Sequence, residues 1–321
     1  MSLLEVQNLT TYYTTLRGPV HAVENISFSM DKGEPLGLAG ESGCGKTTVA
    51  LSILKILPYN GKVISGKILF KGKDIVKVSD EEMRTQIRWK GVSLIFQGAM
   101  NALNPVYKIE DQIIEAILTH EPGVTKKEAK ERIVRLFEMV GVDPSRKGNY
   151  PHEFSGGMKQ RAMIAMALAC NPEILIADEP GTALDVIVQA QVLKLFNELK
   201  KRLNLATILI SHDLSIISET CDKLAIMYAG KIVELGDVYT MFKDPLHPYT
   251  EGLISAFPNI KEQRRKMISI PGTPPDLLRP PSGCKFHPRC SYAMDICKKN
   301  EPEFIEISKG HFVMCHLVSK E

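Results

Sequence analysis

The sequence has no long hydrophobic run, and nowhere does it hold the roughly 20 consecutive apolar residues that cross a bilayer. Its first residues, Met1 to Leu9, alternate like a strand and lack a cationic, cleavable leader. Internal repeats and low-complexity tracts are absent as well. These absences predict a cytoplasmic chain that reaches a membrane only through a partner.

The chain also has little net charge and few cysteines. Its 40 Lys/Arg against 37 Asp/Glu give +3, too little to indicate a nucleic-acid partner, although residues from Asn259 onward hold 11 Lys/Arg against 7 Asp/Glu. A reducing cytosol disfavours disulfides as the role of the seven cysteines. With 321 residues, 44% of them hydrophobic, the chain has an ordinary globular composition and room for about two domains.

A glycine-rich loop follows a short apolar segment, Pro35–Ala39, and precedes a segment with helical spacing, Thr47–Leu57. The loop, Gly-Glu-Ser-Gly-Cys-Gly-Lys-Thr from residue 40 to 47, matches G-x-x-x-x-G-K-[ST], so backbone N–H groups and the helix dipole would bind phosphates. The residues expected to hold a nucleoside triphosphate are Gly40, Ser42, Gly43, Cys44, Gly45, Lys46, Thr47 and Thr48. Lys46 would reach the β- and γ-phosphates, and the Thr47 hydroxyl would bind Mg²⁺. The alternative is a glycine-rich turn that carries a lysine by chance.

Two carboxylates end a second apolar segment, Ile174–Ala177. A continuously apolar run is typical of a buried parallel strand, whose carboxyl end opens onto the ligand crevice. Asp178 is then placed to hold Mg²⁺, and Glu179 to polarise an attacking water. Taken alone, the pair would fit a solvated strand end equally well.

A second anion site is predicted before the alanine-rich helical segment Met158–Ala169. Ser155, Gly156 and Gly157 lie where its N-terminal N–H groups would point at a phosphate. Because one bound nucleotide does not need two such surfaces in one chain, we expect the second surface to complete the site of a partner chain.

The pattern of segments predicts an α/β fold. Strand-like runs alternate with helical ones, and Leu224–Tyr228 and Lys231–Leu235 read as a hairpin. The capping box Thr125 to Glu128 opens a helix that Gly141 ends. The block at about 98–164 has helical patterns and is expected to be an inserted helical subdomain. Proline density rises after residue 257, which sets a first domain at 1–257 and an extension at 258–321.

In this order, the motifs resemble those of ABC-transporter ATPases over about the first 250 residues. Phe154–Gln160 is similar to the signature Leu-Ser-Gly-Gly-Gln, with Phe154 in place of leucine and Met158-Lys159 before the glutamine. The resemblance implies a RecA-like P-loop ATPase core with an antiparallel β part. It assigns catalysis to Lys46, Gln97, Glu179 and His212, Mg²⁺ binding to Thr47, Gln97 and Asp178, adenine stacking to Tyr13, and the D-loop to Ala183–Asp185.

Later segments resemble the ATP-binding subunits of oligopeptide and, most closely, dipeptide importers. They are Phe96–Pro105, Pro151–Gln160, His247–Thr250, Pro271–Asp276 and Pro280–Cys290. The resemblance implies a peripheral subunit at the cytoplasmic face of the membrane. Its partners would be two permease subunits, a second ATPase subunit, identical or homologous, and an external peptide-binding protein. Peptides are the expected cargo, with a nickel complex or another small solute as the alternative. We expect Ala99–Tyr107 to border a groove that receives a permease helix.

The proline-rich extension is expected to be irregular and to need a metal to order it. Cys284, Cys290, Cys297 and Cys315 would supply four thiolates, which suit zinc or an iron–sulfur cluster. His287, His311 and His316 keep a mixed-ligand zinc site open, while the importer resemblance favours a [4Fe–4S] cluster. Because the nucleotide motifs all precede residue 213, the extension is expected to take no part in MgATP binding.

One alternative belongs to another class: a soluble ABC ATPase whose iron–sulfur tail binds nucleic acid through Arg264, Arg265 and Lys266. Nucleic-acid-binding segments show clustered positive charge interleaved with aromatic residues, whereas the excess positive charge of this tail is spread out. We therefore expect no nucleic-acid partner.

Overall fold

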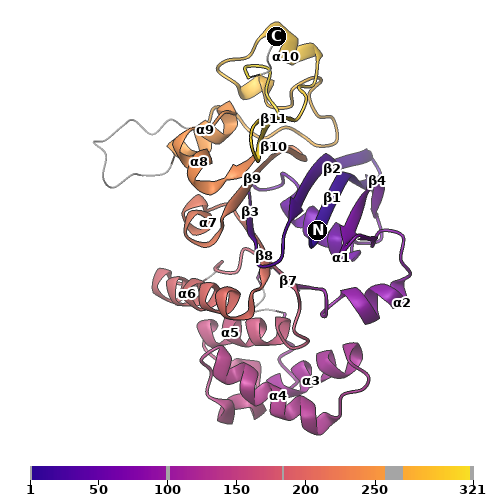
Figure 1. The fold of residues 1–321 in the computed structure, drawn as a ribbon, viewed down its shortest axis with the longest axis vertical. Coiled ribbons are helices and arrows are strands. Elements are labelled where there is room, and N and C mark those ends of the chain that lie inside the picture. The colour runs from indigo at the N-terminus through magenta and orange to yellow at the C-terminus, as the bar shows by residue number, and fades with distance from the viewer. Residues whose placement is uncertain (1, 99–101, 183, 257–269, 319–321) are drawn as a thin grey trace. The chain divides into compact units, whose positions relative to one another are not determined.

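The computed structural model describes residues 2–98, 102–182, 184–256 and 270–318 (Figure 1). The chain forms two compact units, one made of Met1–Met30, Pro35–Val76 and Ile210–Glu321, the other of Asp31–Glu34 and Lys77–Leu209. Ala183 of the predicted D-loop, residues 99–101 of the predicted permease groove, and the basic residues at 264–266 lie outside the described residues.

An antiparallel sheet in the first unit has the strand order β2-β1-β4-β5. Its strands are β1 (Leu4–Thr15), β2 (Gly18–Met30), β4 (Gly61–Phe70) and β5 (Lys73–Asp74). The apolar pattern predicts only part of each of the three long strands. β1 continues through polar residues because it pairs on both sides, for example Tyr13 with Val20 and with Gly61. Asn8 and Asn25 adopt positive φ angles of 50° and 52° where the β1–β2 register shifts.

The first unit also contains the strand order β11-β12-β10-β9-β3. These strands are β3 (Pro35–Ala39), β9 (Lys223–Tyr228), β10 (Lys231–Asp237), β11 (Ile305–Ser308) and β12 (His311–Val313). β3 is buried along its length and runs parallel to β9, as a central strand of an α/β sheet does. The predicted hairpin is confirmed, since Ala229 and Gly230 take left-handed φ angles of 48° and 82° between β9 and β10. The helices of this unit are α1 (Lys46–Leu54), α7 (Leu214–Thr220), α8 (Val238–Lys243), α9 (Pro248–Ser255), η5 (His287–Arg289) and α10 (Asp295–Lys299).

Most of the described part of the extension is irregular, as predicted, but two short strands order part of it. β12 pairs with β10, with Glu234 opposite Val313, so the extension adds two strands to the sheet edge. Phe286 is buried against the rings of Tyr228 and Tyr249, at centroid distances of 5.1 and 5.3 Å. Sheet pairing and aromatic burial therefore order this segment, which the proline-rich sequence does not suggest.

Three neighbouring strands form the core of the second unit, in the order β8-β7-β6. They are β6 (Val92–Ile95), β7 (Ile174–Asp178) and β8 (Ala206–Ser211), whose last two residues belong to the first unit, and β6 runs parallel to β7. The helices are α2 (Asp80–Glu82), η1 (Met83–Ile87), α3 (Ile109–His120), α4 (Lys126–Met139), η3 (Pro144–Gly148), η4 (Pro151–Glu153), α5 (Gly156–Ala167) and α6 (Val186–Leu203).

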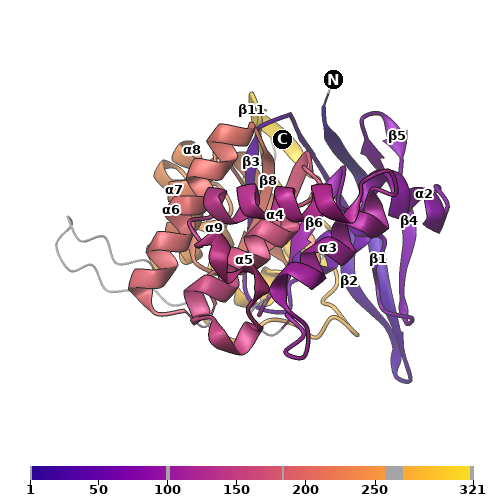
Figure 2. The same ribbon diagram turned by 90° about the horizontal axis from the view of Figure 1, so that it is seen from below.

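Between β6 and β7 the described residues form helices and connecting loops and no strand, and α3, α4 and α5 pack side by side (Figure 2). The predicted capping box is confirmed: Thr125 and Glu128 exchange hydrogen bonds at the start of α4, and Gly141 follows its end with a φ of 67°. α4 buries Ile133, Leu136 and Phe137 and leaves its charged residues outside. Among the described helices, none is both long and apolar enough to cross a membrane.

Candidate functional site

The loop between β3 and α1 depends on glycine at its two ends. Gly40 and Gly45 have φ angles of 143° and 107°, which side chains rarely allow. A Cβ on Gly40 would lie 2.1 Å from the Met227 carbonyl oxygen, and one on Gly45 would lie 2.1 Å from that of Ala22. Backbone packing on both sides therefore fixes the loop, which leads directly into the N-terminus of α1. That helix has no acidic residue in its first turn to oppose an anion.

Lys46 lies inside this loop. Its side chain is buried, and Nζ donates hydrogen bonds to the carbonyl oxygens of Gly40 at 2.7 Å and Glu41 at 2.9 Å. The Cys44 thiol lies 3.6 Å from the same Nζ; burial raises its pKa, although the lysine charge opposes this, so the thiol stays protonated. The loop thus holds a buried ammonium group where the motif places the phosphates.

Tyr13 lies on the α1 side of β1. Its hydroxyl is 3.2 Å from Thr48 Oγ1, and its ring packs against Gly61, where a Cβ would come within 2.7 Å. Tyr12, on the opposite face of the strand, packs on His21 with ring centroids 4.2 Å apart. Strand alternation therefore directs Tyr13, and not its neighbour, toward the helix that follows the phosphate loop.

The second unit brings Gln97 and Glu179 together. Gln97 Nε2 donates to Glu179 Oε2 at 2.9 Å, and Thr182 Oγ1 donates to the same oxygen at 3.0 Å. Glu179 has a φ of 49°, a strained value for this residue type and one that clusters at functional sites. Asp178 precedes it as the buried last residue of β7. Thr182 is absent from the sequence prediction, although a hydroxyl three residues after a carboxylate is a local turn signal.

The second predicted anion site lies at the start of α5. Ser155 is the N-cap, and its Oγ accepts a hydrogen bond from Met158 N at 3.4 Å. A Cβ on Gly157 would lie 2.6 Å from Val188 Cγ1, so this helix end packs closely on the first turn of α6. Phe154, which replaces the leucine of the commonest signature, is buried.

His212 is exposed and follows β8 directly. Asp213 N donates to Ser211 Oγ at 3.0 Å, and the Asp213 carboxylate accepts from Ser215 N at 2.8 Å as the N-cap of α7. This tight turn presents the imidazole at the end of the strand. Tyr13, the loop and His212 thus belong to the first unit, while Gln97, Asp178, Glu179 and Ser155 to Gly157 belong to the second. Their joint action stays a prediction.

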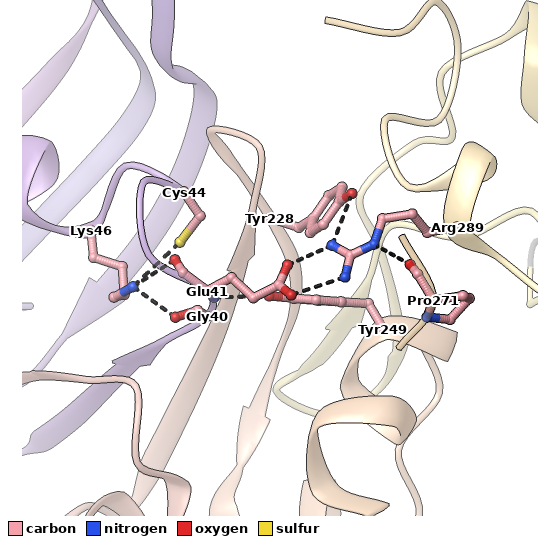
Figure 3. A network of polar contacts seen from close by, with 8 residues as sticks. All are labelled: Gly40, Glu41, Cys44, Lys46, Tyr228, Tyr249, Pro271 and Arg289. Atoms are coloured by element: carbon pink, nitrogen blue, oxygen red, sulfur yellow. Dashed lines mark hydrogen bonds and ion pairs between the residues drawn. The ribbon is translucent and has the colours of Figure 1, made fainter. Parts of the chain in front are cut away.

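One connection to the phosphate loop is missing from the sequence prediction. Arg289 of the extension donates to both carboxylate oxygens of Glu41, at 2.6 and 2.9 Å (Figure 3). The extension therefore contacts the phosphate loop directly, while the expectation that it takes no part in MgATP binding stays a prediction. No periodic pattern in the sequence indicates an ion pair between residues 248 positions apart.

The four cysteines of the extension lie near one another. The pKa of the Cys284 thiol is raised to about 11, mainly by burial and further by Cys315, Cys297 and Cys290. Cys284 N also donates to the Cys297 carbonyl oxygen at 2.8 Å. Within the described residues, however, no group of three or more His, Cys, Asp or Glu side chains is arranged to hold a metal ion.

The three candidate zinc histidines each have one ring nitrogen in a hydrogen bond. His287 Nδ1 contacts the Cys284 carbonyl oxygen at 2.9 Å, His316 Nε2 contacts that of Asn300 at 2.9 Å, and His311 Nε2 contacts Glu234 Oε1 at 2.8 Å. Glu234 is fully buried, so the His311 contact is a structural connection of the extension.

Solved structures with the same fold include two ATP-binding cassettes. A dimeric cassette in a post-hydrolysis state bound to ADP and Pi superposes with a TM-score of 0.64 at 22% identity, over 73% of this chain and 98% of that one. A subunit of the cbiONQ ABC transporter complex from Clostridium perfringens gives a TM-score of 0.64 at 27% identity, over 76% and 91%. These similarities confirm the predicted α/β P-loop fold with its antiparallel part.

Sequence relatives extend the match through the tail. The ABC transporter family model matches residues 23–182, and the oligopeptide/dipeptide transporter C-terminal region matches residues 233–297. The dipeptide transport ATP-binding protein DppD of Bacillus subtilis (strain 168) is 47% identical, over 98% of this chain and 94% of that protein. The oligopeptide transport ATP-binding protein OppD of the same strain is 46% identical, over 98% and 89%, and DppD of Escherichia coli (strain K12) is 43% identical, over 98% and 97%. The chain therefore belongs to the family of ATP-binding subunits of oligopeptide/dipeptide ABC transporters.

Proposed function

We propose that this chain hydrolyses MgATP to power the uptake of di- or oligopeptides through an ABC importer. Its likeness to dipeptide and oligopeptide transport ATP-binding proteins over 98% of its length supports this function most strongly. The match includes the C-terminal region typical of these transporters, which a general ABC ATPase does not need.

The first unit would bind the nucleotide. Tyr13 would stack on the adenine, and the backbone of Gly40, Ser42, Gly43, Cys44 and Gly45 would surround the phosphates. Lys46 would exchange its contacts with the Gly40 and Glu41 carbonyl oxygens for phosphate oxygens. Thr47, with Gln97 and Asp178, would hold Mg²⁺, and Thr48 would contact the phosphates.

Glu179 would orient and polarise the attacking water, held in place by Gln97 and Thr182. His212 would contact the γ-phosphate. Phosphoryl transfer depends mainly on positioning and charge neutralisation, so these roles need placement more than reactive side chains. Ser155, Gly156 and Gly157 of a second ATPase subunit would close over the γ-phosphate from the other side.

The assembly would contain two permease subunits, a second ATPase subunit and an external peptide-binding protein. The chain would then work at the cytoplasmic face of the membrane without crossing it. The exposed side chains of Val106 and Tyr107, at 71% and 57% exposure, support a permease contact at the end of the predicted groove.

A [4Fe–4S] cluster on Cys284, Cys290, Cys297 and Cys315 is proposed as a structural element of the extension. The four thiols are the donor type that such a cluster or a zinc ion takes, although the described residues are not arranged to hold a metal ion in this structure. The resemblance to peptide importers makes mixed-ligand zinc with His287, His311 or His316 the weaker choice. Bound there, the cluster would supply covalent cross-links between loops.

Glu179→Gln tests the hydrolytic assignment. The variant should bind MgATP as the wild type does and accumulate ATP-bound dimers, while turnover falls by about 100-fold or more. Wild-type turnover would remove Glu179 from the mechanism. For the cargo, uptake of a radiolabelled dipeptide should disappear in cells whose only copy carries Lys46→Ala. Dipeptide uptake that persists while nickel uptake fails would favour the metal-complex alternative.

A further inference from the structure

Glu41, the second residue of the phosphate loop, is held by a two-pronged contact. Arg289 Nη1 lies 2.6 Å from Glu41 Oε2, and Nη2 lies 2.9 Å from Oε1. Parallel bonds of this kind between guanidinium and carboxylate are among the strongest in proteins and fix orientation as well as distance. The Arg289 side chain is buried while that of Glu41 is 27% exposed, so water screens the pair only in part.

Arg289 is itself fixed from two other directions (Figure 3). Its Nε donates to the Pro271 carbonyl oxygen at 2.7 Å, and Nη1 approaches the Tyr228 hydroxyl at 3.4 Å. Its guanidinium carbon lies 5.7 Å from the centre of the Tyr228 ring. The extension therefore presents a rigid cation to Glu41.

Glu41 connects Arg289 to the backbone of the phosphate loop. Its N–H donates to the Tyr249 hydroxyl at 2.9 Å, and its carbonyl oxygen accepts from Lys46 Nζ at 2.9 Å. A single residue thus contacts Arg289 through its side chain and Lys46 through its backbone. An unpaired carboxylate at this position would also repel a triphosphate, and Arg289 neutralises it.

We propose that Arg289 is a positioning residue for the phosphate loop, which neutralises and orients Glu41 and so makes MgATP affinity depend on the docked C-terminal extension. The inference rests on the proposed binding of nucleotide phosphates by Lys46. The nucleotide motifs assign no role to Arg289 or to the Glu41 side chain, and the last residue that they assign is His212.

Other contacts allow this role to be separated from simple docking of the extension. Lys285 pairs with Glu24 and Lys231 with Glu301, while His311 contacts Glu234. None of these pairs involves a residue of the phosphate loop. Because they and the β10–β12 pairing remain, loss of Arg289 should leave the extension attached. Glu301→Gln is the matched control, since it weakens the same attachment away from the nucleotide.

The experiment compares MgATP dissociation constants and steady-state kinetics of the full chain. Arg289→Gln should weaken binding about tenfold and raise KM similarly, with kcat within about threefold of the wild type. Glu41→Gln should shift affinity by less than about threefold, and added to Arg289→Gln it should restore affinity to within about threefold of the wild type. Glu301→Gln should bind MgATP within about twofold of the wild type.

Three results would overturn the inference: unchanged affinity in folded Arg289→Gln, an equal loss in Glu301→Gln, or no recovery in the double variant. Should Arg289→Gln not fold, Arg289→Lys, which keeps the charge and loses the fork, carries the test and should lose affinity about threefold. Lys46→Ala separates this inference from the proposed function. If it abolishes MgATP binding while Arg289→Gln and Arg289→Lys do not weaken it, only the inference fails; if Lys46→Ala binds MgATP normally, the nucleotide assignment itself is wrong.

Discussion

Gln97 donates a hydrogen bond to Glu179 at 2.9 Å, so two polar residues that follow β6 and β7 meet through their side chains. The resemblance to ABC ATPases assigns Gln97 to Mg²⁺ and Glu179 to water. The hydrogen bond connects these two roles, because the Gln97 amide orients the Glu179 carboxylate that is proposed to activate water. Thr182 holds the same oxygen from the other side.

Removing the Thr182 hydroxyl should slow hydrolysis without weakening nucleotide binding. Thr182→Val deletes one of two side-chain donors to Glu179 Oε2 at similar side-chain volume, so the carboxylate samples unproductive orientations. We expect kcat to fall about tenfold with KM changed less than about threefold, measured by phosphate release. Thr182→Ser retains the donor and should restore most of the rate. Equal rates in the valine and serine variants would contradict a positioning role.

The groove prediction can be tested at its described end. Tyr107→Cys should crosslink to a cytoplasmic helix of the permease in the assembled importer, because this side chain is 57% exposed beside the predicted groove. Tyr59→Cys is a suitable control, since Tyr59 is fully exposed and belongs to the first unit, whereas the predicted groove belongs to the second. Crosslinks that form from Tyr59 and not from Tyr107 would place the permease elsewhere.

His247 predicts a loss of stability in mild acid. Burial lowers its pKa to about 3, whereas an unfolded histidine titrates near 6.5. The unfolded chain therefore takes up the proton first as pH falls below about 6.5, and stability present above that pH declines toward pH 3. At pH 5 the buried imidazole lowers the free energy of unfolding by about 2 kcal/mol relative to its value above pH 6.5.

His247→Asn should reduce that pH dependence. Asparagine can replace Nδ1 as the acceptor for Tyr249 N at the start of α9, and it does not titrate. We expect the difference in unfolding free energy between pH 7.5 and pH 5 to shrink by about 2 kcal/mol in urea denaturation. His152→Asn, at an exposed position, should leave the difference unchanged. An unaltered difference in His247→Asn would show that the buried imidazole does not control acid stability.

Local signals predict much of this fold, and long-range contacts explain what they miss. The capping box at Thr125, the hairpin at Gly230 and the strand before Asp178 each have a pattern of a few residues, and all three are observed. The pairing of β12 with β10 has no comparable signal, because β12 is three residues long and its partner lies far away in sequence.

The candidate site likewise contains residues that local motifs predict and residues that only the three-dimensional structure reveals. Lys46 and Asp178 belong to short motifs whose chemistry requires those residue types at that spacing. Arg289 belongs to no motif; its role follows only from the fold that brings it to Glu41. Thr182 is intermediate, since its turn is local but its target oxygen is visible only in three dimensions.

The final prediction concerns the four cysteines and the tail that carries them. Anaerobically purified protein should be brown, absorb near ~400 nm and contain about four irons per chain. Cys290→Ser should lose the iron, whereas Cys170→Ser, which alters a buried thiol of the second unit, should keep it. Arg289 adjoins Cys290 and contacts Glu41 of the phosphate loop. The Cys290→Ser protein, whose tail is loosened, should therefore also bind MgATP more weakly. Iron content, measured by a colorimetric assay, tests the cluster; MgATP titration tests its connection to the loop. Colourless protein with one zinc per chain would replace the cluster by zinc, and protein without either metal would leave the four thiols without this role.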